Sequence, residues 1–375
     1  MARKKASAEQ NALDRQFMAA AIRLSQRHSG RTSTNPSVAT LIVRDEGPGP
    51  MIVGSGVTAI GGRPHAETEA LAEAGELARG ATAYVTLEPC AHHGRTPPCA
   101  NALAAAGIRR VVGAASDPDP RVSGKGYEIL RAAGVEVIER VLAEEAADRM
   151  AGYLIRSLKK RPEVTLKIAV SRDGMIGRQG EGQVAITGPV ARRQVHMMRA
   201  ACDAILVGVG TAQADDPELT VRLPGLEGRS PARIVLDRQA RLPPLSKLAF
   251  TARETPVLIA AGADVAAAKK AALEALGVRF LATETYDGRV ALPELLEDLA
   301  AQGMSSLMVE GGANTAKAFL DEDLVDRIVL FCGPASIGEG GIVSPVDHDH
   351  IPDGFRLIRE ARFGDDTYAE WTKAL

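Results

Sequence analysis

The sequence has few aromatic residues and few cysteines. Phe, Trp and Tyr make up 3% of its 375 residues, and there are four cysteines. So few rings argue against an aromatic platform on which nucleic-acid bases stack. The formal net charge of −2 also provides no basic field that would attract a polyanion. These two shortages weigh against nucleic-acid binding.

The chain also lacks a long apolar segment. No run approaches the roughly 18 apolar residues that suggest a membrane span. The basic start, 1–17, contains no continuous apolar stretch of the signal-peptide kind. We therefore expect a cytoplasmic protein with no membrane association, in which a structural disulfide is disfavoured. Metal binding or catalysis becomes the stronger explanation for closely spaced cysteines.

The length favours two domains, because 375 residues exceed one ordinary hydrophobic core. We predict a flexible tail over 1–10 and a first domain over 11–145, in which strands alternate with helices. That alternation indicates a three-layer α/β/α fold. A charged helix over 146–162 is predicted to link it to a second α/β domain over 163–375, whose last predicted strand is 326–334. The two halves show no internal repeat.

The first candidate site combines one histidine, one glutamate and two cysteines. His65 and Glu67 begin a predicted helix, 24 residues separate His65 from Cys90, and eight separate Cys90 from Cys99. One imidazole and two thiolates suit tetrahedral Zn²⁺ with a fourth position open to water. Glu67 could then carry a proton from that water to leaving ammonia. The pattern H-x-E followed by P-C is typical of zinc nucleobase deaminases, although Cys99 lies further from Cys90 than usual.

Each element of this pattern also has an ordinary explanation. A histidine can cap a helix, a glutamate can be solvated, and two cysteines can lie in a loop. In combination and in this order they favour a metal site. His92 and His93 are competing ligands that the spacing leaves open.

Longer stretches of the first half resemble a known family. "NPSV" (35–38), "PHAETEAL" (64–71), "TLEPCAHHGRTPPC" (86–99) and "SDPDPRVSGKG" (116–126) are similar to the bifunctional deaminase–reductases of riboflavin biosynthesis. The resemblance implies a cytidine-deaminase-like fold, zinc held by His65, Cys90 and Cys99, and Glu67 as proton donor. It further implies that Asn35 lines the pyrimidine pocket and that Arg95 meets the substrate phosphate. Val57 and Thr58 stand where the family commonly has an aromatic–His pair.

The second half contains a glycine-rich turn between a predicted strand and a predicted helix. Gly311 and Gly312 follow "SSLMVE", and such a turn lets backbone N–H groups approach a phosphate at the helix N-terminus. A tight strand-to-helix turn without a ligand is the alternative. Gly208-Val209-Gly210 is not a Rossmann fingerprint, because Gln213 occupies the position of the third glycine.

The motif order "VSRDG", "ITGPVARRQVHMMRA", "GVGTAQADDPELTVR", "RIVLD" and "VEGGANTAKAFL" is similar to the reductase half of the same family. That resemblance implies a dihydrofolate-reductase-like fold that uses NADPH. By position, the expected cofactor contacts are Ala169, Thr211, Asp215, Gly312, Ala313, Asn314, Thr315, Ala316, Lys317 and Ala318. The expected substrate contacts are Gly182, Arg199, Leu219, Arg222 and Glu310. The two arginines suit a phosphate dianion as forked donors, and solvated surface arginine is their alternative.

Three positions depart from the family pattern in the reductase half. Gly182 and Val184 stand where some relatives have Ser and Trp, and Ala169 stands where glycine is frequent. We expect rearranged cofactor contacts at these positions without loss of the activity.

Taken with the resemblance, the sequence predicts two consecutive reactions. The first is hydrolytic deamination of 2,5-diamino-6-ribosylamino-4(3H)-pyrimidinone 5′-phosphate, and the second is NADPH-dependent reduction of the ribosyl group to ribityl. The expected partner is this small pyrimidine ribose-phosphate, with the chain as a homo-oligomer (dimer or tetramer). Two alternatives are a nucleoside or tRNA-base deaminase fused to an unrelated reductase, and a zinc-stabilised binding module without catalysis. Glu67 discriminates against the latter, since a structural zinc site needs no carboxylate beside its ligand.

Overall fold

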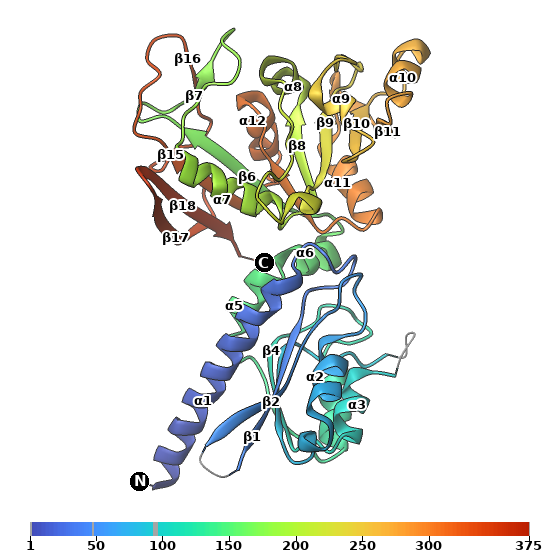
Figure 1. The fold of residues 1–375 in the computed structure, drawn as a ribbon, viewed down its shortest axis with the longest axis vertical. Helices are drawn as coiled ribbons and strands as arrows, with labels where there is room; N and C mark the ends of the chain where they lie inside the picture. The colour runs from blue at the N-terminus through green and yellow to red at the C-terminus, as the bar shows by residue number, and fades with distance from the viewer. Residues whose placement is uncertain (1, 47–48, 93–96, 375) are drawn as a thin grey trace. The chain divides into compact units, whose positions relative to one another are not determined.

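The computed structural model describes residues 2–46, 49–92 and 97–374. The chain divides into two compact units, 1–159 and 160–375 (Figure 1). Each unit is built around its own mixed sheet. None of the helices in the described part of the chain has both the length and the apolar character that a membrane crossing requires.

The first unit has a five-stranded sheet in the order β2-β1-β3-β4-β5. Strand β1 pairs antiparallel with β2 and β3, whereas β3, β4 and β5 run parallel. Helix α1 packs with β1, β3 and α5, while α2, α3 and α4 form a second group. Its elements are α1 (Ala2–Ser25), β1 (Ala39–Asp45), β2 (Pro50–Val57), α2 (Ala66–Ala74), β3 (Thr82–Leu87), α3 (Cys99–Ala105), β4 (Arg110–Ala115), α4 (Lys125–Ala132), β5 (Glu136–Ile138), α5 (Ala143–Arg149) and α6 (Ala151–Lys159).

The second unit has a nine-stranded sheet in the order β11-β10-β9-β8-β14-β6-β15-β18-β17. Strands from β11 to β15 run parallel, and β18 and β17 add an antiparallel edge. The strands are β6 (Glu163–Val170), β7 (Met175–Arg178), β8 (Ala204–Gly208), β9 (Ala232–Leu236), β10 (Val257–Ala261), β11 (Arg279–Ala282), β12 (Thr285–Tyr286), β13 (Arg289–Val290), β14 (Ser306–Val309), β15 (Arg327–Cys332), β16 (Gly341–Val343), β17 (Phe355–Phe363) and β18 (Asp366–Lys373). The helices are α7 (Pro189–Arg199), α8 (Val209–Asp215), α9 (Lys247–Phe250), α10 (Ala267–Glu274), α11 (Leu292–Ala301) and α12 (Ala313–Asp321).

Three expectations about the elements were wrong. Residues 2–10, predicted as part of a flexible tail, are helical and form the first turns of α1. The single helix predicted over 146–162 is instead parts of two helices, since Met150, with φ −118°, separates α5 from α6. The sheet also continues past 326–334 with the hairpin β17–β18.

Burial explains why the parallel strands were predictable and the last hairpin was not. Strand β10 is buried at every position, so it reads as a short continuous apolar run. Strand β17 is the edge strand, and five of its nine residues face solvent, four of them charged, so its sequence shows no clear apolar alternation. The carboxyl ends of the central strands β6, β8 and β14 lie together in this order of strands, and the second site is built there.

Candidate functional sites

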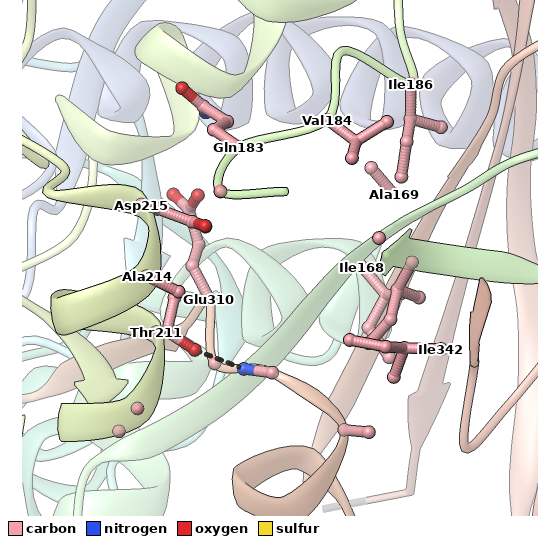
Figure 2. Close-up of a pocket in the computed structure, with 18 of the residues that line it drawn as sticks. Ile168, Ala169, Gln183, Val184, Ile186, Thr211, Ala214, Asp215, Glu310 and Ile342 are labelled. Atoms are coloured by element: carbon pink, nitrogen blue, oxygen red, sulfur yellow. Dashed lines mark hydrogen bonds between the residues drawn. The ribbon is translucent and has the colours of Figure 1, made fainter. Parts of the chain in front are cut away.

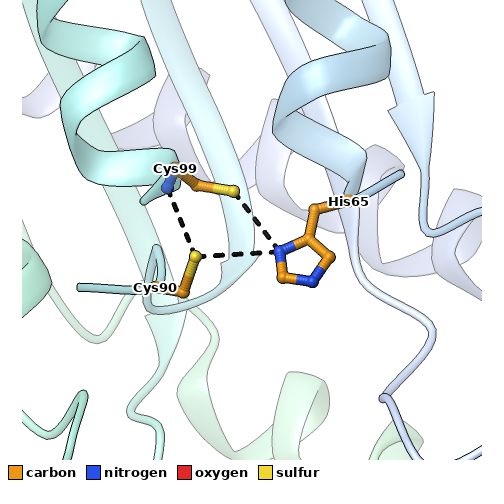
Figure 3. Close-up of side chains that lie close together, drawn as sticks. All are labelled: His65, Cys90 and Cys99. Atoms are coloured by element: carbon orange, nitrogen blue, oxygen red, sulfur yellow. Dashed lines mark hydrogen bonds between the residues drawn. The ribbon is translucent and has the colours of Figure 1, made fainter. Parts of the chain in front are cut away.

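His65, Cys90 and Cys99 come together in the first unit (Figure 3). The Nδ1 atom of His65 lies 3.7 Å from Cys90 Sγ and 3.4 Å from Cys99 Sγ. Tetrahedral zinc with Zn–S near 2.3 Å and Zn–N near 2.0 Å requires an S···N separation of about 3.5 Å. The three ligand atoms are therefore spaced to hold one zinc ion. His92 does not join them, and no other such group occurs within the described ranges.

Local structure explains how the two cysteines meet. His65 is the residue before α2, Cys90 lies in the turn after β3, and Cys99 is the first residue of α3. The backbone N–H of Cys99 donates to Cys90 Sγ at 3.2 Å, and the N–H of Ala100 donates to the Cys90 carbonyl at 3.3 Å. The start of α3 thus directs backbone donors at the Cys90 turn, which favours a thiolate. Hydrogen bonds from Cys99 and His65 lower the pKa of the Cys90 thiol to about 4.

Helix α4 supports the same turn from the other side. Glu88 is buried, and its two carboxylate oxygens accept the N–H groups of Gly124 and Gly126 at 3.1 Å each. A Cβ atom on Gly126 would lie 2.0 Å from the carbonyl oxygen of Pro89. Only glycine allows α4 to approach the Pro89–Cys90 backbone so closely.

Glu67 lies beside the three candidate ligands in the first turn of α2. It is buried, with 4% of its surface exposed, and it has a hydrogen bond with the Cys99 side chain. Burial and the negative charge of Cys90 raise the pKa of Glu67 to about 7, against the opposing effect of His65. A carboxyl group with that pKa can both accept and donate a proton near neutral pH.

The other expected deaminase residues are placed as follows. The amide Nδ2 of Asn35 donates to the carbonyl of Gly62 at 2.8 Å. Thr58 is buried, and its hydroxyl accepts the N–H of Val38 at 3.0 Å, so this side chain braces the start of β1. Arg95 lies outside the described residues.

A cavity of about 820 Å³ lies in the second unit. It is lined by the carboxyl ends of β6, β8 and β14, by the first turn of α12, by α7 and α8, and by the segment 179–187. One wall is apolar and is formed by Ile168, Ala169, Val184, Ile186 and Ile342 (Figure 2). The opposite side carries acidic and hydroxyl groups from α8 and β14, including Thr211 and Asp215.

The cavity gathers many of the residues expected to contact cofactor or substrate, and it leaves four out. The expected residues that line it are Ala169, Gly182, Arg199, Thr211, Asp215, Arg222, Glu310, Gly312, Ala313, Asn314 and Thr315. Of the remaining four, Ala316 and Leu219 are buried in hydrophobic clusters, Lys317 forms an ion pair with Asp321 at 2.8 Å, and Ala318 packs against the core. For the three residues on α12 the reason is helical geometry, because the first turn of α12 lines the cavity and the following turn faces the sheet or solvent.

The glycine-rich turn is held by a contact from α8. The hydroxyl of Thr211 accepts the N–H of Gly312 at 3.0 Å (Figure 2). A Cβ atom on Gly208 would lie 2.5 Å from Thr315 Oγ1, so glycine permits the close approach of β8 and α12. The backbone N–H groups of Ala313, Asn314 and Thr315 belong to the first turn of α12, where helices have no internal acceptor for them.

A buried ion cluster lies at the end of β14. Glu310 accepts hydrogen bonds from Nε and Nη2 of Arg199, both at 2.9 Å, and Lys167 Nζ lies 3.6 Å from Glu310 Oε2. Burial alone raises the pKa of Glu310, but Arg199 and Lys167 outweigh it and hold the pKa at about 2. The alternative of a solvated Arg199 is therefore wrong, since its side chain is 11% exposed and its fork is paired with Glu310.

Sequence reasoning missed five basic residues that line the cavity: Lys167, Arg178, Arg192, His196 and Arg241. Arg192, His196 and Arg199 have the spacing i, i+4, i+7, which places them on one face of α7, and that spacing was an available signal. Burial, together with Arg199 and Arg222, lowers the pKa of His196. Lys167 and Arg241 carried no such signal, because their neighbours in the cavity are distant in sequence.

Comparisons with known proteins agree with both sites. Residues 11–115 match the cytidine and deoxycytidylate deaminase zinc-binding region, and residues 162–367 match the RibD C-terminal domain. The riboflavin biosynthesis protein RibD of Aquifex aeolicus is 41% identical over 328 residues, covering 88% of this chain and 89% of the relative. RibD of Escherichia coli is 39% identical over 337 residues, covering 87% and 89%.

The chain belongs to the RibD family. A solved RibD structure from Acinetobacter baumannii has a TM-score of 0.83 and 34% identity, covering 97% of this chain and 100% of that one. A Thermotoga maritima structure with a TM-score of 0.83, 32% identity and the same coverage is described as a diaminohydroxyphosphoribosylaminopyrimidine deaminase/5-amino-6-(5-phosphoribosylamino)uracil reductase. As a RibD protein, the chain is a bifunctional enzyme of riboflavin biosynthesis with a zinc-dependent deaminase domain and an NADPH-dependent reductase domain.

Proposed function

We propose that the first unit hydrolyses the exocyclic amine of 2,5-diamino-6-ribosylamino-4(3H)-pyrimidinone 5′-phosphate. The second unit then reduces the ribosyl group of the product, 5-amino-6-(5-phosphoribosylamino)uracil, to ribityl with NADPH. The observation that carries this proposal is the pairing of a buried Glu67 with the His65–Cys90–Cys99 group. A structural zinc site has no use for a buried carboxyl group whose pKa is near neutral.

In the deaminase site, His65, Cys90 and Cys99 would hold zinc and leave one position open to water. When bound, the metal would lower the pKa of that water. Glu67 accepts the proton of the attacking water and returns it to the leaving amine, so a C–O bond forms, a C–N bond breaks and ammonia leaves. Asn35 is proposed to hold the pyrimidine, because an amide both donates to and accepts from a ring edge.

In the reductase site, the cofactor supplies the hydride and the protein positions it. The nicotinamide is proposed to lie on the apolar wall that includes Ala169 and Val184, with Asp215 facing the same cavity. The first turn of α12 is proposed to hold the pyrophosphate with its N–H groups. Bound there, the cofactor would supply a hydride to C1′ of the open-chain sugar imine, and a proton taken up at the nitrogen would complete the amine.

The substrate end of the cavity is proposed to be the ion cluster and Arg222. Arg222 donates to Glu218 at 2.8 Å, and its side chain is 53% exposed, so donors remain available for a phosphate. Arg199 shares its fork with Glu310, which supports a role in holding the sugar end together with Lys167. The cytoplasmic location and the homo-oligomer stay predictions; four free cysteines support the former.

The experiment that tests the proposal gives zinc-loaded protein the freshly made diaminopyrimidine phosphate, with and without NADPH. Ammonia release and NADPH absorbance are followed together. We expect ammonia without NADPH, and NADPH oxidation only after deamination. Ammonia without any NADPH oxidation would contradict the reductase half. No ammonia release would contradict the substrate assignment and favour a nucleoside deaminase.

A further inference from the structure

One arginine of the reductase unit is wholly enclosed by protein. Arg233 lies on β9, and its side chain is 0% exposed. Its two Nη atoms donate to four uncharged oxygens, three of them backbone carbonyls. Burial lowers the pKa of Arg233 to about 10. A buried cation that is bonded to uncharged oxygens is costly to keep, so the bonds that it makes are the place to look for its use.

The bonds of Arg233 join two segments that are distant in sequence. Nη1 donates to the Glu218 carbonyl at 3.1 Å and to the Thr251 hydroxyl at 2.8 Å. Nη2 donates to the Thr251 carbonyl at 3.0 Å and to the Thr255 carbonyl. The planar fork therefore ties the segment 216–222, which follows α8, to the turn that follows α9.

The segment 216–222 has a conformation that needs such support. Asp216 has φ +39° and Leu219 has φ +55°, values that residues other than glycine rarely adopt unless the surrounding structure imposes them. Leu219 is 4% exposed and packs in a hydrophobic cluster. The carbonyl that precedes it, that of Glu218, is the one that Arg233 binds. The turn is thus anchored in the protein interior by a side chain and by a carbonyl.

The residues after Leu219 are held in the same way. The Thr220 carbonyl accepts from Nη1 of Arg199 at 3.2 Å. The N–H of Val221 donates to the Ser230 hydroxyl at 3.0 Å. The backbone from 218 to 221 is therefore fixed residue by residue, and the bond from Arg233 is the first in this series.

Glu218 connects the buried arginine to an arginine of the cavity. Its carbonyl accepts from Arg233, and its carboxylate Oε2 accepts from Nη1 of Arg222 at 2.8 Å. Arg222 lines the cavity, and its side chain is 53% exposed. An exposed side chain has little packing to orient it, so the position of the Arg222 guanidinium depends on Glu218 and on the backbone of the segment. Arg233 fixes both.

We propose that Arg233 is a positioning residue of the reductase, which fixes Glu218 and thereby sets Arg222 at the substrate end of the cavity. The inference rests on the proposed function, in which Arg222 binds the phosphate of the substrate. Arg233 acts through these residues, because it is not among the described residues that line the cavity. Losing it should weaken substrate binding more than it slows hydride transfer.

The test measures steady-state NADPH oxidation by the zinc-loaded, full-length protein with supplied 5-amino-6-(5-phosphoribosylamino)uracil. Arg233→Lys keeps the charge but has no fork with which to join the two segments. We expect the KM for the uracil substrate to rise roughly 10-fold, because a misplacement of about 1 Å can cost up to about 100-fold. The kcat and the KM for NADPH should change less than about twofold. An unfolded fraction would lower the apparent kcat and leave KM unchanged, so the split separates positioning from lost stability.

A double-mutant cycle tests whether Arg233 acts through Arg222. Arg222→Gln alone should raise the KM for the uracil substrate roughly 10- to 100-fold, since a hydrogen bond to a charged group is lost. Adding Arg233→Lys to Arg222→Gln should then raise KM less than about twofold further, because residues that act as one unit are not additive. A further rise of the full size of the single Arg233→Lys effect would overturn the proposal.

Thr251→Val is the matched control. It removes one acceptor from the same guanidinium and leaves the bond to Glu218 in place. We expect the second unit to unfold at lower urea while the KM for the uracil substrate stays unchanged. An equal KM rise in Thr251→Val and Arg233→Lys, or no rise in Arg233→Lys, overturns the proposal.

Ser230→Ala keeps the proposal testable if Arg233→Lys does not fold. It removes the bond to Val221 on the same segment, so it should raise the KM for the uracil substrate and be non-additive with Arg222→Gln. An unchanged KM in Ser230→Ala would then overturn the proposal. Failure of the unaltered protein to reduce the uracil substrate would instead contradict the proposed reductase function, and the inference about Arg233 with it.

Discussion

At the scale of the residue, two buried glutamates behave in opposite ways because of their neighbours. Burial raises the pKa of Glu67 to about 7, beside the negative charge of Cys90. At Glu310 two cations outweigh burial and hold the pKa at about 2. The first carboxyl group can therefore move a proton near neutral pH, while the second stays charged and fixes Arg199 and Lys167 in place.

Glu67→Gln tests the first of these roles. We expect ammonia release to fall about 10²- to 10⁴-fold, the usual contribution of a general acid–base group. Zinc content should remain one per chain, because Glu67 is not one of the three candidate ligands. Metal analysis and a coupled ammonia assay measure the two quantities. Glu69→Gln, an exposed position on the same helix, serves as control, and normal deamination by Glu67→Gln would refute the mechanism.

Glu310→Gln tests the ion cluster. The change leaves Arg199 and Lys167 buried without their counter-charge, which costs about 3–5 kcal/mol of reductase-domain stability. We expect NADPH oxidation on the deaminated substrate to be lost, with ammonia release unchanged. Glu297→Gln, exposed on α11, should affect neither activity. Full NADPH oxidation by Glu310→Gln would show that the cluster is dispensable.

At the scale of the element, the sequence allowed prediction of those helices, strands and sites that have a regular pattern of buried residues or a specific spacing of functional residues. Strands buried on both faces, such as β10, are short continuous apolar runs in the sequence, and the helix predicted to begin at His65 and Glu67 is present as α2. The zinc triad was predictable because one histidine and two cysteines, in this order and beside a glutamate, are a combination typical of zinc deaminase sites. The β17–β18 hairpin, the break at Met150 and the cavity residue Arg241 were not, since each depends on partners far along the chain.

Gly126→Ala tests how α4 supports the zinc site. An added Cβ would lie 2.0 Å from the Pro89 carbonyl, so the Pro89–Cys90 turn must shift. Because zinc tolerates little change in ligand position, we expect zinc affinity to fall roughly 10- to 100-fold, as for loss of a supporting group. Competition with a zinc chelator measures it. Gly228→Ala, where no atom lies within 4 Å of the added Cβ, is the control, and equal zinc affinity in both variants would contradict the role of α4.

Helix α1 is held on the sheet by a buried ion pair. Asp14 accepts from Nη1 and Nη2 of Arg110 on β4, both at 2.7 Å, and from the Tyr84 hydroxyl at 3.0 Å. Burial alone raises the pKa of Asp14, but these hydrogen bonds and one from Gln10 outweigh it and leave the pKa below its usual value. A lowered folded-state pKa means that Asp14 stabilises the fold above about pH 4 and that this stability is lost as the pH falls further.

The pH dependence is measurable by hydrogen exchange of β3 and β4 peptides in urea. We expect the deaminase unit to unfold at lower urea at pH 3 than at pH 6. Asp14→Asn should lower stability by about 3 kcal/mol at pH 6 and flatten the acid dependence. Tyr84→Phe should cost about 1 kcal/mol and keep the slope, because the ion pair remains. An unchanged slope in Asp14→Asn would assign the acid sensitivity to other carboxylates.

At the scale of the whole molecule, each unit contains its own core and its own complete site. The candidate zinc residues and Glu67 belong to 1–159, and all residues that line the cavity belong to 160–375. The hydrophobic clusters are likewise confined to one unit or the other. Damage to one site therefore leaves the residues of the other in place.

This separation predicts that two inactive variants complement each other. Glu67→Gln protein cannot supply the deaminated product and Glu310→Gln protein cannot reduce it, so neither alone converts the diaminopyrimidine phosphate to the ribityl product. Mixed in equal amounts with NADPH, they should restore the conversion, because the intermediate released by one chain can bind the other. Chromatography of the ribityl product over time measures the rate. Absence of product, with ammonia release and reduction of supplied intermediate each intact, would mean that the intermediate passes between sites of one chain without release.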